Sequence, residues 1–90
     1  MKHVTAERFW KSFDTLPIEI QKLAREKFAL FVENPHHPSL RTKKMMGEDG
    51  IWEGHISLGY VFTFRYGNLD GEQVIESLDI GKHDDVYFRI

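Results

Sequence analysis

The chain has 90 residues, a formal net charge of −2 and no cysteine. This length predicts one domain, residues 1–90, with a single modest core. The lack of cysteine excludes a disulfide framework, a thiol nucleophile and a Cys-type zinc site, and it suits the cytoplasm. The N-terminus is charged where a signal peptide would be apolar, and no apolar run approaches the roughly 20 residues of a membrane span. We therefore expect a cytoplasmic protein with no membrane partner.

The charge is unevenly distributed along the chain. Residues 1–45 hold nine Lys and Arg against five Asp and Glu, whereas residues 46–90 hold three against nine. Nucleic-acid-binding proteins are usually basic overall. Any contact with nucleic acid would therefore depend on the local basic cluster of Arg41, Lys43 and Lys44.

Two helices are predicted in the first third of the chain. Thr5 is a favourable N-cap for a short helix over residues 5–14, which carries Phe9 and Phe13. Pro17 suits the first turn of a second helix, which Asn34-Pro35 ends. An apolar stripe with a period of 3.6 residues marks the side of this helix that faces the core: Ile20, Leu23, Ala24, Phe28 and Phe31.

From Ile51 onward the apolar period changes from 3.6 to 2, which indicates strands. Three strands are expected over residues 51–57, 60–66 and 73–80, with Val74, Leu78 and Ile80 in phase, and residues 43–46 could form a fourth. Helices followed by strands predict an α+β fold. We expect two N-terminal helices packed on one face of a curled three- to four-stranded antiparallel sheet.

The alternation places His55 opposite the apolar side chains Trp52 and Ile56 of the first strand. The same face is expected to be mostly polar along all three strands, and no further helix is predicted to cover it. Its other residues are Glu53, Ser57, Val61, Thr63, Arg65, Ser77 and Asp79. An uncovered face of a curled sheet would form a natural groove.

Two histidines are the main candidates for chemistry. His83 follows the last strand, and antiparallel pairing would bring it towards His55 across the sheet. Paired histidines can act as general base and general acid. Tyr87 lies four residues after His83, on the same face if a helical turn forms there. The alternative is that these side chains are exposed to solvent and have no role.

Lys43 and Lys44 could contact phosphate and stabilise a charged transition state, or they could simply be solvated. His36 and His37 lie between prolines, but their spacing matches no standard metal-ligand pattern. No Gly-rich phosphate loop or serine elbow is present. We expect neither a metal nor a cofactor.

The motifs LPIEIQKLAREKFALFVENPHHPSL, KK, WEGHISLGYVFTF and IGKHDDVY, in this order, resemble the RelE/ParE superfamily of toxin–antitoxin toxins. The resemblance covers residues 9–88 and is closest to the RelE- and YafQ-like enzymes that cleave mRNA. It implies a type II toxin that binds the ribosome and cuts mRNA through attack of a ribose 2′-OH on the adjacent phosphate. It also implies a cognate antitoxin partner, and no contact with DNA except through that antitoxin.

The resemblance also assigns roles to single residues. His55 matches a strand histidine of YafQ-like members, His83 a catalytic histidine or arginine, and Tyr87 the terminal tyrosine of RelE-type members. Lys43 and Lys44 match a basic stretch near the scissile phosphate. Three further basic residues are candidates for contact with RNA: Arg41, Arg65 and Lys82.

Two positions depart from the family pattern. Val61 stands where many members have arginine, and Gly59 stands where YafQ-like members have an acid. These departures keep an alternative open: a ParE-like toxin that binds DNA gyrase without cleaving RNA, or an inactive homologue bound by an antitoxin.

Overall fold

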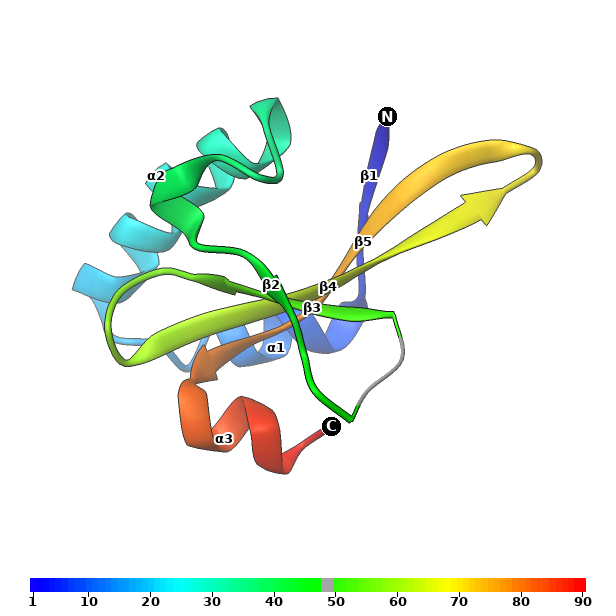
Figure 1. Ribbon diagram of the computed structural model, residues 1–90. Coiled ribbons are helices and arrows are strands. Elements are labelled where there is room, and N and C mark those ends of the chain that lie inside the picture. Colours follow the sequence, from blue (N-terminus) through cyan, green and yellow to red (C-terminus); the bar gives the residue numbers. More distant parts are fainter. Residues whose placement is uncertain (48–49) are drawn as a thin grey trace.

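The computed structural model describes residues 1–47 and 50–90. In chain order its elements are β1 (Lys2–Thr5), α1 (Glu7–Phe13), α2 (Ile18–Glu33), the 3₁₀ turn η1 (Pro38–Leu40), β2 (Lys43–Lys44), β3 (Ile51–His55), β4 (Tyr60–Leu69), β5 (Glu72–Lys82) and α3 (His83–Phe88). Figure 1 shows the long β4–β5 hairpin projecting beyond the rest of the molecule. In the described part of the chain, no helix is long and apolar enough to cross a membrane.

The sheet has five strands in the order β1-β5-β4-β3-β2, and it is mixed rather than antiparallel. The predicted antiparallel order of β2 to β5 is confirmed, with β2 only two residues long. The expectation of three or four strands was wrong, because β1 adds a fifth strand that pairs parallel with β5. The first helix consequently begins two residues later than predicted, with Ala6 at its N-cap in place of Thr5.

The core lies between one face of the sheet and helices α1 and α2. Its centre is aromatic: the ring of Phe31 on α2 lies 5.0 Å from that of Phe62 and 4.8 Å from that of Phe64, both on β4. Ala24 of the predicted apolar stripe is fully buried beside them. The 3.6-residue stripe of α2 therefore meets the period-2 face of β4, as the sequence pattern predicts.

A register shift between Thr63 and Phe64 changes which residues of β5 face the core. Thr63 pairs with Asp79, but Phe64 pairs with Ser77, so the chain of β5 carries one extra residue at this point. Ser77 therefore lies on the core side with Ile75, and the predicted in-phase set of Val74, Leu78 and Ile80 is wrong. The core cluster contains Ile75 and Ile80 instead.

The opposite face of the sheet is not open, contrary to expectation. Helix α3 follows β5 directly and contacts β4 and β5. It covers three polar side chains, Glu53, Thr63 and Asp79, each only 1% exposed. These residues form one row, because Glu53 pairs with Thr63 and Thr63 with Asp79. A short C-terminal helix therefore lies across a buried polar row.

Candidate active site

Glu53 is the centre of the polar cluster beneath α3. Its Oε1 lies 3.1 Å from Nε2 of His55, and its Oε2 lies 4.0 Å from Nε2 of His83. The hydroxyl of Tyr87 donates a hydrogen bond to Oε2. Buried carboxylates require such partners. The sequence interpretation placed Glu53 on this face but gave it no role, and only its strand phase beside His55 could have pointed to it.

Helix α3 brings His83 and Tyr87 onto one face, because they are four residues apart. Their rings stack with centroids 4.2 Å apart. The side chain of His83 remains 46% exposed, and its Nδ1 lies 3.3 Å from Oδ1 of Asp84. His83 can therefore reach a bound substrate, while Glu53 lies behind it.

Burial, together with the hydrogen bond to Glu53 and the charge of that carboxylate, raises the pKa of Tyr87 to about 12. The phenol is therefore neutral at physiological pH and donates its proton to the Glu53 carboxylate. A proton that Tyr87 accepts from another group can be passed on only to Glu53 within this cluster.

His55 lies deeper in the protein than the sequence interpretation assumed. Its side chain is 17% exposed, and its Nε2 must carry the hydrogen that is donated to Glu53. Its Nδ1 is buried without a hydrogen-bond partner among the described residues, as is Oγ1 of Thr63. His55 and His83 thus both approach Glu53, but the geometry favours an orienting role for His55.

A cavity of about 510 Å³ opens beside this cluster. Its walls are formed by β2, the two residues that follow it and α3: Lys43, Lys44, Met45, Met46, His83 and Tyr87. Lys43 pairs with Glu53 across the strands, so its side chain lies on the same face as the cluster. Lys44 has the opposite phase, and its Nζ lies 5.7 Å above the ring of Trp52. Lys43 is therefore the better placed of the two cations.

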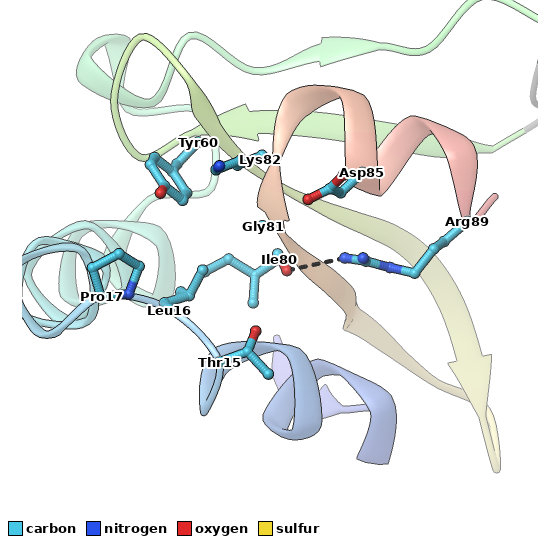
Figure 2. Close-up of a pocket in the computed structure, with 9 residues that line it drawn as sticks. All are labelled: Thr15, Leu16, Pro17, Tyr60, Ile80, Gly81, Lys82, Asp85 and Arg89. Atoms are coloured by element: carbon cyan, nitrogen blue, oxygen red, sulfur yellow. Dashed lines mark hydrogen bonds between the residues drawn. The ribbon is translucent and has the colours of Figure 1, made fainter.

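The other basic residues named from the sequence lie apart from this cavity. Nε of Arg65 is 2.9 Å from Oε1 of Glu76. Arg41 is exposed just after η1, with a backbone φ of 49°. Lys82 lines a separate cavity of about 260 Å³ beside Tyr60, on the side of α3 that faces the α1–α2 turn (Figure 2). RNA contacts by these three residues stay a prediction.

The histidines between the prolines have structural partners. Nδ1 of His36 lies 2.9 Å from Oγ1 of Thr42, and its Nε2 lies 2.6 Å from the hydroxyl of Tyr66. Nδ1 of His37 accepts a hydrogen bond from the backbone of Ser39. Within residues 1–47 and 50–90, no group of three or more His, Cys, Asp or Glu side chains could hold a metal ion.

Comparison with solved structures identifies the fold. YafQ from E. coli strain BL21(DE3) superposes with a TM-score of 0.74 over 96% of this chain and 97% of its own, at 10% identity. The YoeB/ParE toxin from Agrobacterium tumefaciens gives a TM-score of 0.71 over 92% and 99%, at 17% identity. RelE in the E. coli RelBE toxin–antitoxin complex gives 0.64 over 90% and 94%, at 20% identity.

The chain has the fold of the RelE, YafQ and YoeB toxins. The RelE-type fold covers 90% or more of this chain in each of these comparisons, which confirms the fold that the motifs predict. No family model and no curated protein matches the sequence. At these identities the likeness shows the fold, and any activity has to be argued from the residues present.

Proposed function

We propose that this protein is the toxin component of a type II toxin–antitoxin system and cleaves mRNA on the ribosome. One observation carries the proposal. On a RelE-type fold, His83 and Tyr87 form the wall of a cavity that also contains Lys43, and a buried carboxylate, Glu53, lies behind them. A proton donor, a proton acceptor and a positive charge are the groups that phosphodiester cleavage requires.

The residues can be assigned to the steps of such a reaction. The 2′-hydroxyl attacks the adjacent phosphorus, and its proton passes to Tyr87 while Tyr87 passes its own proton to Glu53. The P–O5′ bond breaks, and protonated His83 supplies the proton that the departing 5′-oxygen needs. The products are a 2′,3′-cyclic phosphate and a 5′-hydroxyl. Lys43 offsets the charge that develops on the phosphate oxygens.

His55 acts in this scheme through Glu53. Its Nε2–H donates to Oε1, which leaves Oε2 directed towards Tyr87 and His83. Orientation of a carboxylate by a second hydrogen bond is a common device at active sites. His55 is accordingly a positioning residue and does not itself touch the RNA.

Induced expression in a bacterial host tests the proposal. The wild type is expected to arrest growth and to stop protein synthesis before DNA synthesis. His83→Ala should relieve the arrest, because loss of a general acid costs about 10²–10⁴-fold in rate. His37→Ala is the matched control, since the side-chain hydrogen bonds of that histidine among the described residues are with Ser39. Equal arrest by His83→Ala and the wild type would contradict the assignment.

A gyrase-binding toxin without nuclease activity is the second candidate, and Val61 favours it. Val61 is fully buried and pairs with His55 across β3 and β4. Many family members carry an arginine at this position, and this chain has no equivalent of it there. This candidate predicts arrest of DNA synthesis first and inhibition of DNA supercoiling in vitro. It also predicts that His83→Ala arrests growth fully.

We further propose a cognate antitoxin as the protein partner. The RelE structures that resemble this chain include complexes with RelB from E. coli, Pyrococcus horikoshii and Methanococcus jannaschii. Co-expression with the product of an adjacent small gene should restore growth. If no neighbouring gene product relieves the arrest or binds the protein, this part of the proposal is wrong.

A further inference from the structure

Helix α3 has little apolar packing to hold it on the sheet. It has six residues, too few to be stable alone, and Val86 is its one fully buried side chain. Phe88 is 90% exposed. A cavity of about 260 Å³ separates the side of α3 that carries Asp85 from the α1–α2 turn at Leu16 and Pro17 (Figure 2). Something other than packing must therefore fix the position of α3.

Two polar contacts join α3 to the buried row of the sheet. In its last turn Tyr87 donates to Glu53. At its C-terminal end Arg89 binds Asp79 through two nitrogens, Nε at 2.8 Å from Oδ2 and Nη2 at 3.3 Å from Oδ1. Nη2 of Arg89 also lies 3.4 Å from the carbonyl oxygen of Ile80, a contact that Figure 2 marks. Asp79 is 1% exposed, so this two-point ion pair is anchored in the body of the sheet.

We infer that Arg89 and Asp79 are positioning residues, which hold α3 so that Tyr87 and His83 lie over Glu53. Glu53 and Asp79 occupy the two ends of one row across β3, β4 and β5, with Thr63 between them. Glu53 therefore holds α3 through Tyr87, and Asp79 holds it through Arg89. Two such contacts fix the rotation of a short helix. The role in catalysis rests on the proposed function, whereas the role in geometry does not.

Tyr87 itself reports the geometry. Its contact with buried Glu53 raises its pKa to about 12 from the ordinary 10.0. If Arg89→Ala lets α3 move, the phenol gains solvent, loses Glu53 and ionises near its ordinary pKa. Ring resonances of Tyr87, followed by NMR between about pH 9 and 11, measure this directly. In the wild type, Tyr87 should not titrate in this range. In Arg89→Ala, most of the titration of Tyr87 should fall within it.

Two further variants separate positioning from simple destabilisation. Arg8→Ala is the matched control, because Nε of Arg8 binds the carbonyl oxygen of Leu78, next to Asp79, and does not involve α3. It should leave the titration of Tyr87 unchanged. Asp79→Asn with Arg89→Ala removes the buried charge together with its partner, so it should fold even if Arg89→Ala alone does not. It should free Tyr87 to the same degree.

Rates of RNA cleavage by the same variants test the role of Arg89 in catalysis. Misplacement of a catalytic group by about 1 Å can cost 10²-fold in rate, so Arg89→Ala should lose on the order of 10²-fold. Combined with Tyr87→Phe it should lose less than the product of the two single losses, because both changes disturb the same contact between α3 and Glu53. The inference is wrong if Arg89→Ala and Asp79→Asn/Arg89→Ala both fold and Tyr87 still does not titrate below about pH 11 in either variant. If the wild type cleaves no RNA, the NMR result alone decides it, and only the proposed function fails.

Discussion

Glu53 connects most of the groups that we assign to the reaction. It accepts a hydrogen bond from Tyr87, lies 3.1 Å from Nε2 of His55 and 4.0 Å from Nε2 of His83. A carboxylate that is 1% exposed depends on such donors, because an unpaired buried charge is costly. Its partners depend on it in turn for their orientation.

Glu53→Gln should therefore uncouple the site while keeping the shape of the side chain. Burial, the hydrogen bond to Glu53 and the carboxylate charge together raise the pKa of Tyr87, and the neutral amide removes the charge. Tyr87 should then titrate closer to its ordinary pKa, and RNA cleavage should fall by about 10²-fold or more. NMR titration of Tyr87 and single-turnover cleavage measure the two effects. Unchanged values in both would show that Glu53 is not the centre of the site.

The sequence pattern pointed to His55, His83 and Tyr87 as candidates but not to Glu53. His83 and Tyr87 could be paired from their four-residue spacing, since that spacing is local. Glu53 could not be singled out, because a glutamate on an alternating strand face is usually solvated. It is buried only because α3 covers it, and that contact joins residues 34 apart in the chain.

At the scale of elements, local patterns predicted the elements with strong periodicity. The stripe from Ile20 to Phe31 and the alternation from Tyr60 to Tyr66 led to α2 and β4 with few errors. Strand β1 has only four residues, and its partner β5 lies more than 70 residues away, so no local signal marks it. Helix α3 is too short for a periodic signal. The register shift at Thr63/Phe64 cannot be read from β5 alone.

Gly54 in β3 provides a direct test of the contact between the strands and the core. A Cβ atom at this position would overlap the ring of Phe62, its partner on β4. Gly54→Ala should lower the free energy of unfolding by about 1–3 kcal/mol, as overpacking of a core does. Gly59→Ala is the control, because a Cβ there meets no atom within 4 Å. Urea unfolding compares the two, and equal midpoints would contradict the tight contact.

At the scale of the whole molecule, the basic half and the acidic half of the chain both contribute residues to the candidate site. The basic first half supplies Lys43 through β2, whereas the acidic second half supplies Glu53, His83 and Tyr87. The cavity forms where these halves meet. A proposed phosphodiester substrate would therefore meet the positive charge of Lys43 in this cavity, although the net charge of the chain is −2.

The ion pair between Arg89 and Asp79 should also make stability depend on acid pH. Burial alone would raise the pKa of Asp79, but hydrogen bonds led by that from Arg89 outweigh burial and hold it below the ordinary 3.8. A lowered pKa stabilises the fold at pH values above 3.8, and this contribution is lost as the pH falls through the value in the folded protein.

The double variant Asp79→Asn/Arg89→Ala lacks this contribution at every pH. Urea midpoints of the wild type and the variant should therefore differ most near neutrality and converge as the pH falls below 3.8. A constant difference across the acid range would show that the charge of Asp79 does not stabilise the fold.

The central claim concerns RNA cleavage, and end-group analysis of a defined mRNA tests it most directly. Purified protein is incubated with that mRNA on programmed ribosomes, and the ends of the fragments are determined. We predict cuts that require the ribosome and leave a 2′,3′-cyclic phosphate and a 5′-hydroxyl, with His83→Ala slower by about 10²-fold or more. Intact mRNA, or cleavage that His83→Ala performs at the wild-type rate, would contradict the claim.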